Sequence, residues 1–118
     1  MKLLITGGAG FIGSSLVREI IKNKNISIFI IDKINYASNM QTIELFKNNY
    51  PHHFQKIDIC NRKELRVVFN NFQPDGVMHL AAESHVDRSI SDPSEFIRSN
   101  IQGTFSLLEE SRRFFNNL

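Results

Sequence analysis

Hydrophobic residues alternate along the chain between short unbroken runs and stripes with helical spacing. Four runs, at residues 2–6, 27–32, 54–57 and 76–80, are bounded by polar or turn residues. They have the length and composition of strands that are buried on both faces. The segments between them carry apolar residues three or four positions apart, as amphipathic helices do. The pattern therefore predicts strands and helices in alternation.

The predicted helices have recognisable starts. Asn61 precedes Glu64 by three residues, a variant of the capping box, and Asp92 precedes Pro93 at the start of a last helix that runs to about residue 115. Residues 33–38 and 80–90 are predicted to be polar loops. The apolar positions of the first three helices are Phe11, Ile12, Leu16, Val17, Ile20 and Ile21, then Met40, Ile43, Leu45 and Phe46 within residues 39–49, and then Leu65, Val68, Phe69 and Phe72.

This order of elements predicts an α/β fold, with a parallel sheet covered by helices on both faces and joined by right-handed crossovers. In a Rossmann fold that binds NAD or NADP, the strands would lie in the order 3-2-1-4. The fourth strand is apolar, and no later strand remains to pair with its free edge. We therefore expect residues 1–118 to be the N-terminal part of a dinucleotide-binding Rossmann domain, incomplete with about four strands.

The sequence KLLITGGAGFIG joins the first strand to the first helix through three spaced glycines. Gly7 permits a tight turn, Gly10 lets a phosphate approach the backbone, and Gly13 permits close packing of the helix. The first amides of that helix have no acceptors within it and carry a partial positive charge. This arrangement predicts a site for the pyrophosphate of a dinucleotide.

Asp32 ends the second strand, nineteen residues after Gly13. At this position a carboxylate accepts hydrogen bonds from the ribose hydroxyls of the adenosine half and repels a 2′-phosphate. We therefore predict NAD rather than NADP, although Lys33 beside it would soften that repulsion. The alternative is that Asp32 is a turn residue at the end of a strand.

A polar cluster follows the fourth strand in the sequence LAAESHVDRSI, at residues 80–90. Small residues at Ala81 and Ala82 would let a flat ligand lie across the carboxyl end of the strand. The polar side chains of Glu83, Ser84, His85, Asp87 and Arg88 would then face a substrate. A solvated loop in which Asp87 pairs with Arg88 is an equal alternative.

Composition argues against several classes of protein and site. A net charge of +2 with scattered basic residues gives no indication of nucleic-acid binding, and no apolar run has the length of a membrane span. The single cysteine, Cys60, excludes an internal disulfide, and with His52 and His53 it makes a poor metal site, so no metal is expected. His79 is predicted to be a packed histidine within a strand. A cytoplasmic protein is the expectation.

Four segments together resemble the dTDP-glucose 4,6-dehydratases, a family of the extended short-chain dehydrogenase/reductase superfamily. They are GGAGFIG, IDKINYASN, DIC and HLAAESHVDRSI, and the resemblance runs from Met1 to about Arg112. The glycine motif is shared by the whole superfamily, including nucleotide-sugar epimerases and decarboxylases. The segment AAESHVDRSI is more specific to the dehydratases.

The resemblance implies roles for individual residues in binding NAD. The amides of Phe11 and Ile12 would bind the pyrophosphate, and Ser99 stands where the family usually has threonine near the cofactor. Ser84 and His85 would reach the sugar of dTDP-glucose. Taken together, the predicted cofactor-binding residues fall in two parts of the sequence. The first part holds Gly7, Gly10, Phe11, Ile12, Gly13, Asp32, Lys33, Ile34 and Asn35, and the second holds Asp58, Ile59, Leu80, Ala81, Ala82, Glu83, Ser84 and Ser99.

The resemblance also implies a reaction whose catalytic groups this chain lacks. The family oxidises the sugar at C4, eliminates water across C5 and C6, and reduces C6, which requires a tyrosine with a lysine four residues on and an acidic pair. Neither Tyr36 nor Tyr50 has a lysine at that spacing. We therefore expect no catalytic residue in this chain and no activity from it alone. The family is usually homodimeric through helices of this domain.

Other hypotheses stay open. The chain could come from a related nucleotide-sugar epimerase or decarboxylase, which residues 83–90 disfavour. It could be a free-standing NAD-binding module without catalysis. It could also be an interaction protein or a relic that binds no cofactor, which the intact glycines and Asp32 disfavour.

Overall fold

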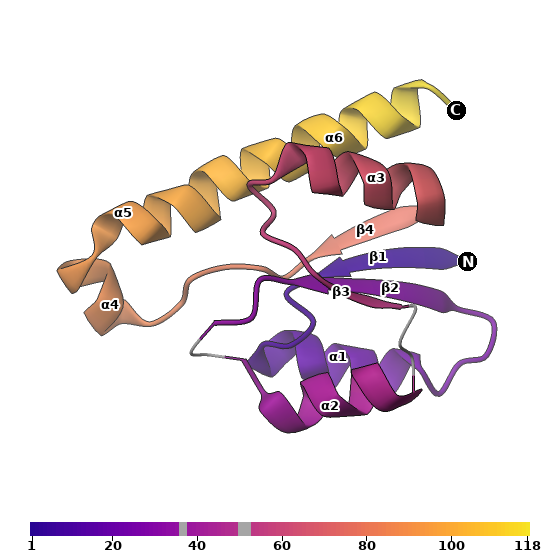
Figure 1. The fold of residues 1–118 in the computed structure, drawn as a ribbon, viewed down its shortest axis with the longest axis horizontal. Helices are drawn as coiled ribbons and strands as arrows, with labels where there is room; N and C mark the ends of the chain where they lie inside the picture. Colours follow the sequence, from indigo (N-terminus) through magenta and orange to yellow (C-terminus); the bar gives the residue numbers. More distant parts are fainter. Residues whose placement is uncertain (36–37, 50–52) are drawn as a thin grey trace.

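The computed structural model of the chain describes residues 1–35, 38–49 and 53–118 (Figure 1). Tyr36, Tyr50 and His52, considered above, lie outside the described residues. The elements follow in the order β1 (Lys2–Thr6), α1 (Phe11–Ile20), β2 (Ser27–Asp32), α2 (Met40–Asn49), β3 (Phe54–Lys56), α3 (Arg62–Phe72), β4 (Gly76–His79), α4 (Val86–Ser91), α5 (Pro93–Phe96), η1 (Ile97–Gly103) and α6 (Thr104–Asn116).

The four strands form one parallel sheet in the order β3-β2-β1-β4, as predicted. β1 is central and pairs with β2 from Lys2 opposite Ser27, and with β4 from Leu3 opposite Gly76. Helices cover both faces: α1 and α2 lie on one side of the sheet, and α3 and α6 on the other (Figure 1). The α/β architecture predicted from the sequence is confirmed.

Two hydrophobic layers hold the helices to the sheet. Successive residues of a strand point to opposite faces, so Leu4 enters the layer beneath α3 and α6 while Ile5 enters the layer above α1. The first layer also holds Phe69 and Phe114, whose ring centroids are 5.4 Å apart. Because both faces of β1 are buried, the strand reads as a continuous apolar run rather than an alternating one.

Side-chain caps begin two of the helices. The Asn61 side chain accepts from the Glu64 amide at 3.2 Å, as the capping pattern predicts, and α3 begins at the next residue. Asn39 likewise accepts from the Thr42 amide at 3.1 Å at the start of α2. In α2, Ile43 is buried as predicted, but Leu45 is 39% exposed and Thr42 is buried in its place.

Two further features differ from the sequence-based prediction. Residues 86–91, expected in a loop, form the short helix α4. Its apolar side chains, Val86 and Ile90, are exposed to solvent and do not pack against the core. The helix predicted from Pro93 to about residue 115 is present to Asn116, but its segment Ile97–Gly103 is a π-helix. No helix within the described part of the chain is both long and apolar enough to cross a membrane.

Candidate functional site

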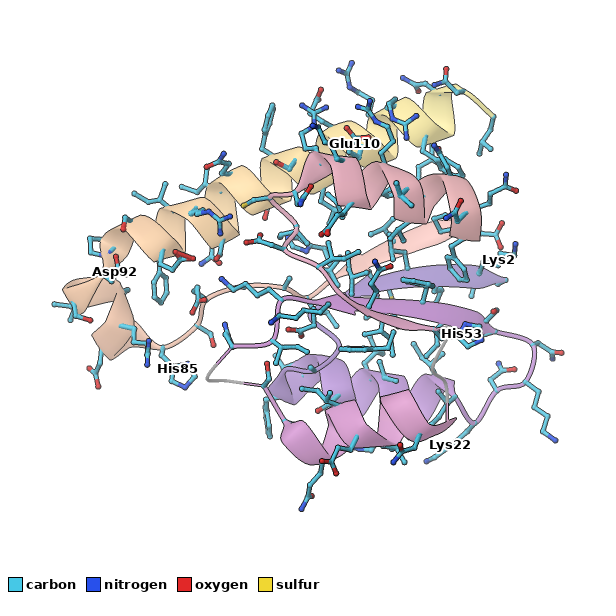
Figure 2. All side chains as sticks on the ribbon, in the orientation of Figure 1. Lys2, Lys22, His53, His85, Asp92 and Glu110 are labelled. Atoms are coloured by element: carbon cyan, nitrogen blue, oxygen red, sulfur yellow. The ribbon has the colours of Figure 1, made fainter. Side chains whose placement is uncertain are left out.

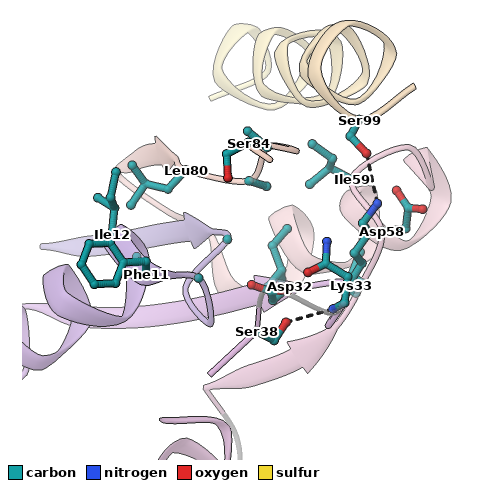
Figure 3. A pocket seen from close by; sticks show the side chains of 18 of the residues that line it. Phe11, Ile12, Asp32, Lys33, Ser38, Asp58, Ile59, Leu80, Ser84 and Ser99 are labelled. Atoms are coloured by element: carbon teal, nitrogen blue, oxygen red, sulfur yellow. Dashed lines mark hydrogen bonds between the residues drawn. The ribbon is translucent and has the colours of Figure 1, made fainter. Parts of the chain in front are cut away.

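The carboxyl ends of β1, β2, β3 and β4 meet at one edge of the sheet, where parallel α/β sheets bind ligands. A pocket of about 460 Å³ lies there (Figure 3). It is lined by Gly7, Gly10, Phe11, Ile12, Gly13, Ile31, Asp32, Lys33, Asn35, Ser38, Ile57, Asp58, Ile59, Leu80, Ala81, Ala82, Ser84, His85 and Ser99.

The glycine loop between β1 and α1 forms one wall of the pocket. Gly7 has a φ of 72° and lies so close to β4 that a Cβ would come within 2.5 Å of the Leu80 carbonyl carbon. A Cβ on Gly13 would overlap the Gly7 carbonyl oxygen, so this glycine packs the helix against the loop itself. The loop backbone can therefore bend under a ligand while α1 begins directly beside it.

The start of α1 presents backbone amides to the pocket. Gly10 precedes the helix, and its own Cβ would meet nothing nearer than the Gly7 carbonyl oxygen at 3.4 Å. Phe11 is 91% exposed, so it contributes little to the core, and both Phe11 and Ile12 line the pocket at the helix start, where backbone amides can bind a phosphate.

Asp32 ends β2 and joins it to the glycine loop. Its carboxylate accepts from the Ala9 amide at 3.0 Å and from the Ile34 amide at 2.7 Å. Each carboxylate oxygen keeps a further lone pair with which to accept a ligand hydroxyl. Ile34 has a φ of 58°, unusual for a β-branched residue, and it does not line the pocket although its amide fixes Asp32.

Lys33 is held by groups on the far side of the pocket. Its ammonium lies 3.2 Å from Glu83 and 3.4 Å from Glu95, and it donates to the Ser99 hydroxyl at 3.0 Å (Figure 3). Burial lowers the pKa of Lys33, but the two carboxylates outweigh burial and raise it. The expectation that Lys33 softens the repulsion at Asp32 therefore does not fit this arrangement.

The end of β3 gives the pocket an apolar floor beside a fixed carboxylate. Ile57 and Ile59 are buried on either side of Asp58. The Asp58 carboxylate accepts from the Cys60 amide at 2.9 Å and from Arg98 at 2.7 Å. Burial raises the pKa of Asp58, but these bonds outweigh burial and lower it, so the group is ionised at neutral pH.

The segment after β4 is fixed at its backbone. The Glu83 amide donates to the Asn100 side chain at 2.8 Å, and Asn100 donates back to the Glu83 carbonyl at 3.0 Å. The Glu83 carboxylate is buried and accepts from Asn35 at 3.1 Å. Glu83 therefore lies beside the pocket lining, while Ser84 and His85 after it face the pocket.

His79 is a satisfied histidine within the sheet, as predicted. The Thr6 hydroxyl lies 2.7 Å from Nδ1 and accepts from the amides of Leu80 and Ala81, and Thr104 lies 2.8 Å from Nε2. Since the Thr6 oxygen already accepts two amides, we assign its proton to the bond with Nδ1. Burial lowers the pKa of His79 and keeps it neutral.

Apart from Ile34 and Glu83, the predicted cofactor-binding residues line the pocket, and so does His85. Ile31, Ser38 and Ile57 also line the pocket and were not predicted to do so. Ile31 and Ile57 each precede a predicted aspartate, so their place at a strand end was the available signal. Among the described residues, no group of three or more His, Cys, Asp or Glu is arranged to hold a metal ion.

Comparison with known proteins gives consistent matches. The sequence profile of the GDP-mannose 4,6 dehydratase family matches residues 4–117. The dTDP-glucose 4,6-dehydratase of Salmonella typhimurium is 51% identical over the whole chain, and that of Neisseria meningitidis 50% identical over 99% of it. The chain covers 33% of each of these relatives, so it spans about a third of their length.

Solved structures match the fold. A dTDP-glucose 4,6-dehydratase from Streptomyces venezuelae, solved with NAD, is 35% identical with a TM-score of 0.84, over 97% of this chain and 36% of that one. A UDP-glucose 4-epimerase from Thermotoga maritima, solved with UDP-glucose, is 31% identical with a TM-score of 0.85, over 97% of this chain and 35% of that one. The fold alone therefore does not separate these two activities.

Proposed function

This chain belongs to the GDP-mannose 4,6 dehydratase family, and from that membership we propose that it is the NAD-binding N-terminal part of a dTDP-glucose 4,6-dehydratase. The observation that carries the proposal is the pocket itself, in which the glycine loop, the start of α1 and the Asp32 carboxylate meet at one edge of the sheet. About 50% identity to dehydratases along the whole chain supports the choice of enzyme.

Each part of NAD would have its own group of residues in the pocket. The amides of Phe11 and Ile12 would bind the pyrophosphate, and Asp32 would accept the ribose hydroxyls. Asp58 and Ile59 would flank the adenine, with Asp58 accepting from its exocyclic amine, and Ile57 lines the pocket beside them. The nicotinamide half would follow residues 80–84, with Ser99 near the cofactor. When bound, NAD would supply the acceptor for a hydride from the sugar.

This chain's own contribution would be binding and orientation. We propose that it forms part of a dinucleotide-binding domain in a longer enzyme that converts dTDP-glucose to its 4-keto-6-deoxy product, with Ser84 and His85 facing the sugar. The catalytic tyrosine, lysine and acidic pair of that reaction must reach the reacting atoms of the sugar. Because residues 1–118 contain no tyrosine with a lysine four positions on, these groups would lie outside them. An epimerase remains the second candidate, favoured by the similar fold of the Thermotoga maritima enzyme.

The test is a calorimetric titration of NAD and of NADP into the folded chain and into Asp32→Ala. We expect saturable NAD binding that Asp32→Ala weakens by about tenfold or more, because hydrogen bonds to a charged group are each worth about 1.5–3 kcal/mol. NADP should lose less, because its 2′-phosphate is repelled by that carboxylate. Equal losses for both cofactors would give Asp32 a structural role only.

Asp75→Ala is the matched control. Asp75 also accepts a backbone amide, that of Lys2 at 2.7 Å, but at the opposite end of β1. We expect Asp75→Ala to leave the NAD dissociation constant unchanged. Absence of NAD binding by the folded wild-type chain would overturn the proposed function.

We also propose that the protein forms a homodimer through the long C-terminal helix. An outer stripe of apolar side chains, Ile97, Ile101, Phe105 and Leu108, is more than half exposed along η1 and α6. Contiguous exposed apolar surface of this kind is typical of a protein interface. We expect the chain to sediment as a dimer and Ile101→Arg to sediment as a folded monomer, whose melting temperature is lower because dimerisation no longer stabilises the native state.

Ile90→Arg is the control for that substitution, because Ile90 is also an exposed isoleucine, at 78% against 65% for Ile101, and lies on α4, outside the outer stripe. It should leave the dimer intact. A monomeric wild-type chain, or dissociation by both variants alike, would contradict the proposed interface.

A further inference from the structure

Lys33 lies where a dinucleotide site would choose between its two cofactors. It directly follows Asp32 and lines the same pocket (Figure 3). In folds of this type a cation near the end of the second strand accommodates the 2′-phosphate of NADP. By position in the sequence, Lys33 is such a cation. Its side-chain contacts, however, direct its charge elsewhere.

The Lys33 ammonium has three donors and three partners. The Glu83 and Glu95 carboxylates lie 3.2 Å and 3.4 Å away, and the Ser99 hydroxyl accepts at 3.0 Å. The Glu83 side chain is only 5% exposed, so solvent and salt screen its attraction for Lys33 weakly. The ammonium is therefore saturated by groups on the β4 and α5–η1 side of the pocket.

The two carboxylates are themselves held in place. Asn35 donates to the Glu83 carboxylate, and Asn100 clamps the Glu83 backbone through both its amide and its carbonyl. Glu95 lies 3.6 Å from Arg98 as well as beside Lys33, and Arg98 in turn binds Asp58. Charges of alternating sign thus run along one wall from Asp58 to Glu83. Moving Lys33 toward a ligand would break its ion pair with the buried Glu83 carboxylate.

We propose that Glu83 and Glu95 determine cofactor selectivity, because they hold the Lys33 ammonium away from the ribose and leave Asp32 as an uncompensated negative charge beside the 2′ position. This inference rests on the proposed NAD-binding function. A 2′-phosphate would meet the Asp32 carboxylate with no cation to neutralise it. Ribose hydroxyls would meet the same carboxylate as a hydrogen-bond acceptor.

Glu95→Gln is the variant that tests this mechanism, because the Glu95 side chain is 43% exposed and the amide can keep the local packing. Removing this carboxylate leaves Lys33 with Glu83 and Ser99 as partners, so one of its three donors becomes available to a phosphate. We expect the ratio of NADP affinity to NAD affinity, measured by calorimetry, to rise about tenfold, the effect of one charge-assisted phosphate contact. Glu109→Gln, on α6 and paired with Arg112, removes the same charge away from the pocket and should leave the ratio unchanged.

The same substitution in a Lys33→Met background separates this mechanism from a general loss of negative charge. If Lys33 mediates the gain, Lys33→Met and Lys33→Met/Glu95→Gln should have equal cofactor ratios. A gain that persists without Lys33, or no gain in Glu95→Gln while NAD still binds, would overturn the inference and leave the proposed function standing. A folded wild-type chain that binds no NAD would overturn both.

Discussion

Replacing Gly7 with alanine is expected to destabilise the protein by about 3 kcal/mol or more and to abolish NAD binding. The added Cβ would come within 2.5 Å of the Leu80 carbonyl carbon and of the Ala81 nitrogen, which are backbone atoms that cannot rotate away. The φ of 72° adds a strain of about 1–2 kcal/mol for a residue with a Cβ. Urea denaturation measures the first effect and calorimetric titration the second.

Gly10→Ala is the matched variant in the same loop. Its Cβ would touch only the Gly7 carbonyl oxygen, at an ordinary 3.4 Å, so the free energy of unfolding should change by less than about 1 kcal/mol. The methyl group would nevertheless stand where the pyrophosphate is proposed to approach, so NAD binding should weaken. A Gly7→Ala protein as stable as Gly10→Ala would contradict this description of the loop.

Glu110→Gln is expected to destabilise the protein by about 3 kcal/mol, because it removes the charge from a buried carboxylate that three arginines share. Glu110 is completely buried between α3 and α6 (Figure 2). Arg66 binds both of its oxygens, at 2.9 and 3.0 Å, while Arg62 and Arg113 donate at 3.0 and 2.8 Å. Chemical denaturation at pH 7 measures the loss.

Glu109→Gln is the control on the neighbouring position. Glu109 pairs with Arg112 on its own helix, and the Arg112 side chain is 68% exposed, so losing this pair should cost much less than losing the Glu110 charge. Equal effects of the two substitutions would show that the Glu110 cluster contributes no more than a surface pair.

Acid should remove the contribution of Glu110 to the free energy of unfolding, and most of this loss should occur above the pKa of Glu110 in the folded protein. The hydrogen bond from Arg66 is the main cause that lowers the pKa of Glu110, against the opposing effect of burial, from 4.5 to about 2. A depressed pKa contributes stability above the unfolded value, and that stability declines as the pH falls from about 4.5 to about 2. The wild-type protein should therefore lose more stability over this range than Glu110→Gln does.

The sheet and its functional edge could be predicted from the sequence because both follow from local pattern and topology. The apolar runs predicted the strands, and the glycine loop indicated a dinucleotide-binding fold, in which the strands lie in the order 3-2-1-4. Gly7, Asp32 and Leu80 had to meet, since the carboxyl ends of parallel strands share one edge. Helix starts were equally readable where a cap was encoded locally, as at Asn61.

Contacts between distant charged residues could not be predicted in the same way. Lys33 meets Glu95 on α5, sixty-two positions later, and only the tertiary fold brings the two residues together. Glu110 resembles a solvated helix position by residue type, yet three arginines from two helices allow it to be buried. Residues 86–91 carry too weak a pattern to indicate a helix, because their apolar residues face solvent.

The central place of β1 in the sheet has a consequence for how the chain folds. β1 precedes both of its neighbours in the sequence, since β2 begins at Ser27 and β4 at Gly76. The edge of β1 that pairs with β4 finds its partner more than seventy residues later in the sequence, and closing a loop of that length slows folding. During translation, from the synthesis of β2 to that of β4, the apolar KLLIT segment can pair along one edge only, and an unpaired apolar strand edge is prone to aggregation.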